Sequence, residues 1–363
     1  MRIKDVEVYA VDLRLATTHE NALARYDTTR DVFVRLVTDE GVVGYGATAP
    51  KPYISGETQE TVVSVLQGQL IPAVRGLDPS CLAQIHRTME RAVVGHPAAK
   101  AAIDLACYDV TGKALGVPVF TLLGGACRLS QEAFDLIDLW PAERAAKEAR
   151  RLVAEGINQI KVKVGKDIEA DLERVRAVRE AAPTATLKVD ANQQWGLKQA
   201  LQFIPRFEEI GVAVVEQPLP AYDVAGMAAV RARVSCTIMA DESLKTAEDA
   251  WHLLSAGAAD ALNVKISKVG GLWPAQRIAV LAQAAGVPCQ AGCTLENALV
   301  DAAAAHLFAS QPNVIWNEIK APQWIVDDIA CGLKVEGGLV HVPLRPGLGL
   351  EIDQERLTRY RVR

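Results

Sequence analysis

The hydrophobic pattern of the chain changes near residue 125. From about residue 132 to residue 321, short apolar runs alternate with longer segments in which apolar residues recur every three or four positions. Such runs are typical of buried strands, and such segments of amphipathic helices. Strands separated by single helices form parallel βαβ units, and about eight of them in series favour a closed barrel. The helical segments end at ordinary helix stops, which are Gly156, Pro183, Gly211, Gly257 and Gly286.

An open doubly wound sheet is the alternative arrangement of the same units. Such a sheet needs a glycine-rich phosphate loop after its first strand. Residues 163–167 read KVGKD and lack the G-x-G-x-x-G pattern. The sequence therefore predicts an α/β fold of the barrel type.

The two ends of the chain differ from this alternation. Residues 1–48 alternate polar and apolar residues like antiparallel strands, with a turn at residues 39–41, and residues 57–115 have helical periodicity. Residues 17–30 and 49–56 are expected to be surface loops, either plain connections or a lid. We predict an N-terminal α+β domain at residues 1–125, a barrel at residues 126–321 and a C-terminal segment at residues 322–363 that returns to the first domain.

Composition and charge narrow the class of partner. The formal net charge is -5 and Lys and Arg are not clustered, so we expect a small-molecule partner and no nucleic acid. The 7 cysteines are scattered without a C-x-x-C pair, which predicts reduced thiols in a cytoplasmic protein rather than disulfides or a zinc site. No apolar run is long enough for a membrane span, so no membrane partner is expected.

Five charged residues occupy the same place in successive units of the alternation. Each lies in or at the end of a short apolar run, and neighbours in the series are 27, 26, 25 and 24 residues apart. Equivalent strand ends of a barrel converge on one mouth, where barrel active sites lie. The series is Lys163, Asp190, Glu216, Asp241 and Lys265.

Lys161 and Lys163 are two positions apart in the segment NQIKVKVG. Residues i and i+2 of a strand face the same side, so both ammonium groups point into the barrel if Val162 and Val164 pack outward. Two neighbouring ammonium groups and a nearby metal disfavour the charged form, which predicts that the pKa of one lysine falls towards about 7 to 8, as suits a general base. A solvated pair on an edge strand is the alternative.

Asp190, Glu216 and Asp241 bring three carboxylates to the same mouth. Each could cap a helix, but three buried carboxylates together repel one another without a cation. Hard oxygen donors without His or Cys indicate Mg2+, with Mn2+ as the alternative. Asn192 and Glu242 lie close enough in sequence to ligate the ion or to support its ligands.

The contexts of these residues form a set of motifs: DAN at 190–192, VEQP at 215–218, ADES at 240–243 and NVKISKVGG at 263–271, with PYISGET at 52–58 and PGLGLEI at 346–352. The set resembles the enolase superfamily, in the subgroup of muconate lactonizing enzymes and dipeptide epimerases, over essentially the whole chain. The resemblance implies a capping domain from both termini over a (β/α)7β barrel. It also implies Mg2+ on Asp190, Glu216 and Asp241, with Lys163 and Lys265 as acid/base groups and Lys161 tuning Lys163.

The chemical step implied by the resemblance is removal of the proton α to a carboxylate, giving an enolate that the metal stabilises. Two lysines on opposite faces favour a racemase or epimerase of an amino-acid-derived carboxylate: an N-acyl amino acid, a dipeptide or a proline derivative. A lyase with the same machinery, either a muconate-type cycloisomerase or a hydroxyproline-type dehydratase, is the alternative. A non-catalytic binding barrel is the third hypothesis. Barrels of this family often assemble, so a homo-oligomer is expected.

Candidate substrate contacts come from the last barrel segments and the N-terminal loops. GCTLEN at 292–297 resembles the family's GCMxES segment and includes Glu296. Dipeptide epimerases carry Asp-x-Asp at the eighth strand, which holds the substrate ammonium; here Glu318 and Lys320 occupy those positions. The 6 histidines fall outside the strand ends and receive no catalytic role. The other candidates are aromatic: Trp324, Tyr26 and Tyr53.

Overall fold

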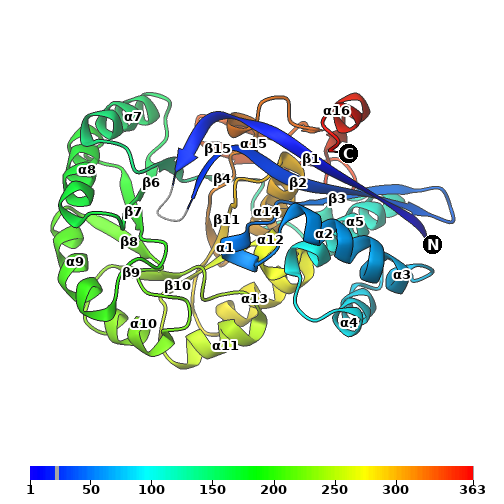
Figure 1. Cartoon of the computed structure of the whole chain (residues 1–363), viewed down its shortest axis with the longest axis horizontal. Coiled ribbons are helices and arrows are strands. Elements are labelled where there is room, and N and C mark those ends of the chain that lie inside the picture. The colour runs from blue at the N-terminus through cyan, green and yellow to red at the C-terminus, as the bar shows by residue number, and fades with distance from the viewer. Residues whose placement is uncertain (21–23, 363) are drawn as a thin grey trace.

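The computed structural model describes residues 1–20 and 24–362. Figure 1 shows a barrel of strands wrapped by helices beside a smaller α+β region, from which the first two strands reach across to the barrel. The prediction of a modified α/β barrel with a capping region made from both ends of the chain is confirmed.

Eight parallel strands form the barrel, and neighbours in the sheet are also neighbours in sequence. The last strand closes on the first through a bridge between Ala133 and Asn317. The strands are β5 (Asp135–Ile137), β6 (Gln159–Lys163), β7 (Thr186–Asp190), β8 (Val212–Glu216), β9 (Thr237–Ala240), β10 (Ala261–Lys265), β11 (Cys289–Gly292) and β12 (Val314–Asn317). The connecting helices are α7 (Ala142–Ala154), α8 (Ile168–Ala181), α9 (Leu197–Glu209), α10 (Val224–Arg231), α11 (Ala247–Ser255), α12 (Ile266–Val269), α13 (Leu272–Ala284) and α14 (Ala298–Ser310).

The strand registers bring the charged strand ends side by side. Lys163 pairs with Asp190 in one ladder, and Asp190 pairs with Glu216 in the next. Val162 and Val164 are buried in the main apolar core. The alternation of a strand therefore turns the lysines of β6 to the opposite side from its valines, as predicted.

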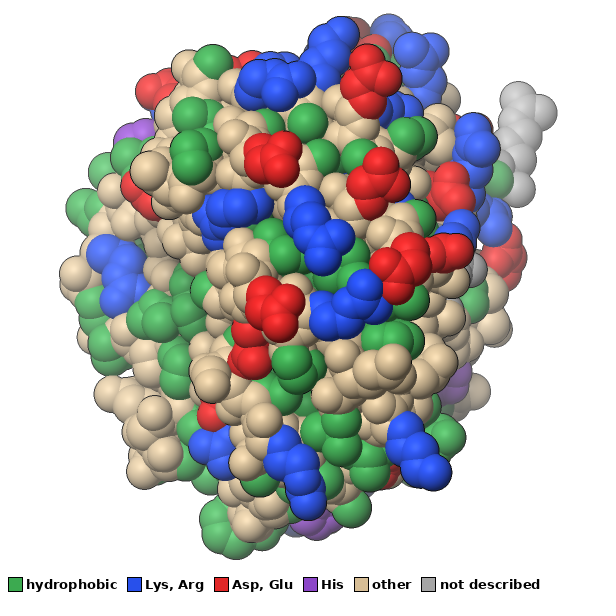
Figure 2. Space-filling model, turned by 90° about the vertical axis from the view of Figure 1, so that its left-hand side faces the viewer, with side chains coloured by type: hydrophobic (Ala, Val, Ile, Leu, Met, Phe, Trp, Pro, Cys, Tyr) green, Lys and Arg blue, Asp and Glu red, His purple; other side chains and the backbone are tan. Residues whose placement is uncertain are grey.

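The outer helices turn apolar stripes to the barrel and charged residues to solvent. In α7, Ala145, Ala149 and Leu152 are buried at helical spacing. Figure 2 looks at this side of the barrel and shows acidic and basic side chains interspersed over it. On the outer surface of these helices, Arg206 Nη1 of α9 lies 2.8 Å from Glu169 Oε1 of α8.

The capping region is an antiparallel sheet of β1 (Ile3–Glu20), β2 (Arg25–Thr38) and β3 (Val43–Thr48), with α5 (Pro97–Leu115) packed on it. Gly46 of β3 permits this packing, because a Cβ there would lie 2.0 Å from the Ala102 carbonyl oxygen of α5. The other helices of this region are α1 (Pro52–Ser55), α2 (Gln59–Val65), the π-helix η1 (Leu66–Leu70), α3 (Ile71–Val74), α4 (Leu82–Ala92) and α6 (Val119–Leu122).

The segment 17–30 differs from the expected surface loop. Among the described residues, β1 continues to Glu20 and β2 starts at Arg25, and His19 pairs with Tyr26. Cross-strand pairing satisfies the backbone of these polar residues, which carry no apolar alternation of their own. Residues 21–23 of the expected loop lie outside the described residues, and the other expected loop, 49–56, contains the short helix α1.

The C-terminal segment runs back to the capping region. The Leu348 N–H donates to Asp109 Oδ1 over 2.8 Å, and Val11 bridges to Arg361. The seven cysteines all lie within the described residues and form no disulfide there. Across the described ranges, no helix combines the length and apolar character that a bilayer crossing requires. The remaining elements are β4 (Ser130–Glu132), α15 (Ala321–Trp324), β13 (Ala330–Cys331), β14 (Lys334–Glu336), β15 (Leu339–His341), β16 (Glu351–Ile352) and α16 (Gln354–Arg359).

Candidate active site

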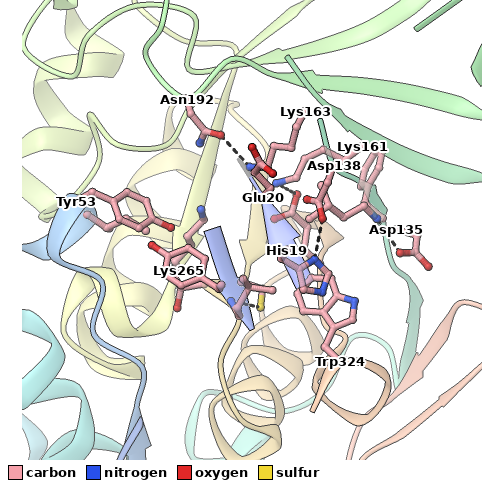
Figure 3. Close-up of a pocket in the computed structure, with 18 of the residues that line it drawn as sticks. His19, Glu20, Tyr53, Asp135, Asp138, Lys161, Lys163, Asn192, Lys265 and Trp324 are labelled. Atoms are coloured by element: carbon pink, nitrogen blue, oxygen red, sulfur yellow. Dashed lines mark hydrogen bonds and ion pairs between the residues drawn. The ribbon is translucent and has the colours of Figure 1, made fainter. Parts of the chain in front are cut away.

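The C-terminal ends of the barrel strands meet in one pocket under the β1–β2 hairpin. Lys161, Lys163 and Lys265 line this pocket together with Asn192 and Glu242. Figure 3 shows Lys161 and Lys163 on one side of the pocket and Lys265 on another. The structure thus brings together the residues that the strand-end spacing singled out.

Each lysine of β6 contacts carboxylates of neighbouring strands. Lys163 Nζ lies 2.6 Å from Asp190 Oδ2 and 3.0 Å from Asn192 Oδ1. Lys161 Nζ lies 2.6 Å from Glu318 Oε1 and 3.5 Å from Asp190 Oδ2. Both lysines are buried, so the alternative of a solvated pair on an edge strand is wrong.

Carboxylates dominate the charge around the lysines. Burial lowers the pKa of Lys161, but the negative charges of Glu216 and Glu318 outweigh burial and hold that pKa above its ordinary value. Burial is likewise outweighed at Lys265, where Asp241 raises the pKa. Among the protein groups alone, the expected fall in pKa is therefore absent for Lys161. The carboxylates that face the two ammonium groups offset the repulsion between them.

Asp190, Glu216 and Asp241 lie fully buried beside the lysines. Asp241 Oδ2 is 2.7 Å from Lys265 Nζ. One buried oxygen at this end of the barrel, Glu242 Oε2, has no hydrogen-bond partner among the described residues. Burial and the charge of Asp241 raise the pKa of Glu242 to about 8.

This donor set fits a hard divalent cation. The donors are carboxylate oxygens, which Mg2+ and Mn2+ prefer over nitrogen or sulfur. The unpartnered oxygen of Glu242 is an acceptor of the kind that a cation or its bound water satisfies. Asp190, Glu216 and Asp241 would therefore hold the ion, with Asn192 and Glu242 beside it.

Two further buried lysines complete the charge balance, and the sequence reasoning missed both. Lys188 Nζ lies 2.9 Å from Glu216 Oε2 and 2.5 Å from Glu318 Oε1. Lys268 Nζ lies 2.6 Å from Asp241 Oδ1. A signal existed for Lys188, because it stands two positions before Asp190 in LKVD and so shares a strand face with it.

The side chains of Glu318 and Lys320, which follow β12, line two different cavities. Glu318 lines the pocket. Burial raises the pKa of Glu318, but Lys161 and Lys188 outweigh burial and lower it to about 2. Lys320 instead pairs with Asp135 and lines a neighbouring groove. Its expected place beside Glu318 is wrong, because the strand ends at Asn317 and the i, i+2 rule no longer applies.

The other residues predicted to contact the substrate also divide into those that line the pocket and one that does not. Tyr26, Tyr53 and Trp324 line the pocket. The rings of Tyr26 and Tyr53 stack with centroids 6.2 Å apart. Glu296 is fully buried behind the wall, where it accepts hydrogen bonds from the Ser267 and Thr294 hydroxyls. Thr294 and Leu295 face the pocket in its place.

His19 and Asp138 also line the pocket, although no histidine was expected in the site. His19 Nδ1 lies 3.1 Å from Asp138 Oδ2, and its ring is 5.1 Å from that of Trp324 (Figure 3). His19 was not recognised because residues 17–30 were expected to form a surface loop. Asp138 was not recognised because it follows β5, a three-residue strand that is too short to stand out in the hydrophobic pattern. The available signal was the pair of acids, Asp135 and Asp138, in the short apolar segment FDLID.

Comparisons with known proteins agree with this architecture. Residues 3–124 match the mandelate racemase / muconate lactonizing enzyme N-terminal domain, and residues 144–356 match the enolase C-terminal domain-like family. N-succinyl-L-Arg/Lys racemase of Bacillus cereus is 32% identical over 359 residues, which cover 98% of this chain and 97% of that protein. The crystal structure of the Bacillus cereus racemase has a TM-score of 0.98 at 31% identity, covering 100% of this chain and 99% of that chain.

Two other relatives carry different activities. Hydrophobic dipeptide epimerase of Enterococcus faecalis is 37% identical over 326 residues, covering 88% of this chain and 91% of that protein. A dipeptide epimerase structure from that organism, complexed with Mg and L-Leu-L-Tyr, has a TM-score of 0.93 at 35% identity and covers 97% and 100% of the two chains. Muconate cycloisomerase 1 of Rhodococcus opacus is 32% identical over 362 residues, 98% of this chain and 97% of that protein. The chain belongs to the mandelate racemase / muconate lactonizing enzyme family of the enolase superfamily, and it is an enzyme of the isomerase type.

Proposed function

We propose that this enzyme is a racemase or epimerase of an N-acylated amino acid and depends on Mg2+, or on Mn2+ in its place. The observation that carries the proposal is that Lys163 and Lys265 line one pocket from different sides beside three buried carboxylates. A substrate Cα between the two amines would present one face to each.

In the proposed reaction one lysine takes the α-proton and the other returns a proton to the opposite face. Lys163 ends β6 and Lys265 ends β10, with three strands between them in the sheet order. Either amine can serve as base if the other is protonated, so both enantiomers are substrates. An ion on Asp190, Glu216 and Asp241 would stabilise the charge of the enolate. Lys161 adds a positive charge close to Lys163 and holds Glu318 in place.

The surroundings of Glu318 favour an acylated amine over a free one. Its carboxylate already receives the ammonium groups of Lys161 and Lys188, at 2.6 and 2.5 Å. Lys320 occupies the second of the two positions that are acidic in dipeptide epimerases, and it is directed to Asp135. A substrate ammonium would meet a carboxylate whose charge the protein has already neutralised.

The test is incubation in D2O with Mg2+ and matched pairs of N-acyl amino acids and dipeptides. We expect deuterium at Cα and loss of optical rotation for N-acyl amino acids, with dipeptides exchanging much more slowly. Preferred exchange of a free dipeptide would overturn the substrate assignment, and absence of exchange in every compound would overturn the reaction.

The second candidate is a lyase with the same groups. The full-length similarity to a muconate cycloisomerase supports it. Incubations that also contain a muconate and a hydroxyproline separate the two reactions, because a dehydratase releases water from its substrate and a cycloisomerase forms a ring. A racemase leaves the skeleton unchanged.

A further inference from the structure

A second group of cation ligands lies behind the pocket wall. Cys293 follows β11, Glu296 lies in the next turn, and Asp301 lies in the first turn of α14. One ligand atom from each of these residues lies within 4.8 Å of the other two. Glu296 and Asp301 are fully buried, whereas Cys293 is half-buried and lines the pocket.

Each of the two carboxylates has one satisfied and one unsatisfied oxygen. Glu296 Oε2 accepts from the hydroxyls of Ser267 and Thr294, at 2.9 and 2.7 Å. Asp301 Oδ2 accepts from the backbone N–H groups of Lys320 and Ala321, at 2.9 and 2.7 Å. Glu296 Oε1 and Asp301 Oδ1 are buried and have no hydrogen-bond partner among the described residues.

The protein does not neutralise these charges with a salt bridge. Within residues 1–20 and 24–362, neither Glu296 nor Asp301 forms an ion pair with a Lys, Arg or His side chain. A buried carboxylate oxygen without a partner is costly, so the arrangement calls for a cation or a shared proton. A shared proton serves two carboxyl groups, but it gives no role to the sulfur beside them.

We propose that Cys293, Glu296 and Asp301 bind one thiophilic divalent cation of the Zn2+ type. One thiolate and two carboxylates are ligands that Zn2+ accepts, whereas Mg2+ avoids sulfur. The site is therefore chemically distinct from the all-oxygen set of Asp190, Glu216 and Asp241. Cys293 connects it to the pocket, which gives the ion a route in. Binding transfers the proton of the Cys293 thiol to solvent.

The proposal is tested by Cd2+ binding to the full chain in excess Mg2+, which keeps the all-oxygen site filled. Equilibrium dialysis gives the stoichiometry, and the ultraviolet thiolate-to-metal absorption reports sulfur ligation. Asp301→Asn is the decisive variant, because the amide oxygen still accepts from Lys320 and Ala321 and every thiol remains. Cys293→Ser and Glu296→Gln remove the other two ligands, and Cys289→Ser is the control at a buried cysteine outside the group.

We expect one Cd2+ per chain to be lost in each of the three ligand variants and retained in the control. Thermal melting checks that the variants are folded. Unchanged stoichiometry and absorption in Asp301→Asn and Cys293→Ser would overturn the proposal and leave a proton shared by the two carboxyl groups. No substrate is present, so the result is independent of the proposed racemase reaction.

Discussion

At the scale of single residues, the pocket is a set of matched charges rather than a pair of lysines. Lys163 forms an ion pair with Asp190, and Lys265 forms an ion pair with Asp241. These contacts join neighbouring strand ends and hold each amine at a fixed place in the wall. The proposed two-base reaction needs that placement, because a proton must leave one face of Cα and arrive at the other.

Replacement of one lysine should separate exchange from inversion. We expect Lys265→Ala to slow racemisation by about 10²- to 10⁴-fold. Lys163 would still exchange the α-proton of one enantiomer with solvent. Chiral chromatography measures the first effect and proton NMR in D2O the second. Lys245→Ala, at an exposed lysine, is the control. A Lys265→Ala enzyme that racemises at the wild-type rate would disprove the two-base assignment.

Glu318 should matter for stability as well as for substrate choice. Glu318→Ala leaves the fully buried Lys188 without one of its two carboxylate contacts, and loss of a buried partner costs about 3 to 5 kcal/mol. Glu318→Gln keeps an acceptor oxygen, so its cost should be smaller. Urea unfolding measures both. Equal stability of the two variants would show that Lys188 does not depend on Glu318.

At the scale of elements, α14 connects the barrel to both ends of the chain through His306. Its Nδ1 accepts from the Phe120 N–H and its Nε2 donates to the Leu348 carbonyl oxygen, each at 3.3 Å. Burial lowers the pKa of His306 to about 4. The folded protein therefore keeps this imidazole neutral at pH values where an unfolded chain would protonate it.

The sign of the pH effect follows from this depressed pKa. The unfolded chain binds a proton from about pH 6.5 downward and the folded chain does not, so stability is present above pH 6.5 and is lost towards pH 4. At about 1.4 kcal/mol per pKa unit, we expect His306 to contribute about 2 kcal/mol less stability at pH 5 than at pH 7.5. His306→Gln removes this contribution, so urea midpoints at the two pH values should differ less in the variant. An identical pH dependence would contradict the assignment.

At the scale of the whole molecule, the proposed ion links the ends of three successive barrel strands, β7, β8 and β9. An ion that binds only the folded state at 100 times its dissociation constant adds about 2.7 kcal/mol of stability. We expect Mg2+ to raise the melting temperature and EDTA to lower it. Asp241→Asn should remove most of this response, whereas Glu336→Gln, at an exposed position, should keep it. A wild-type melting temperature that is the same with Mg2+ and with EDTA would contradict the metal site.

The regular part of the molecule is the part that the sequence predicts. Barrel units repeat, so the strand-end residues stand out by spacing, and their convergence follows from the fold. His19 could not be placed in this way because it lies in a hairpin of polar residues, which has no apolar alternation to predict it. Lys320 could not be placed because it lies after the end of β12, directly before α15. Asp138 was hidden by the shortness of β5. The domain boundaries at residues 125 and 321 and the roles of the site residues stay predictions.

The β1–β2 hairpin contributes His19, Glu20 and Tyr26 to a pocket whose three lysines all come from barrel strands. Part of the wall that would face the substrate therefore lies in a different stretch of the sequence from the lysines. Replacing the β1–β2 hairpin with that of a relative can change which compound binds, because the lysines proposed to transfer protons lie outside it. One barrel can in this way supply a lineage of enzymes that share a first chemical step and differ in what they accept.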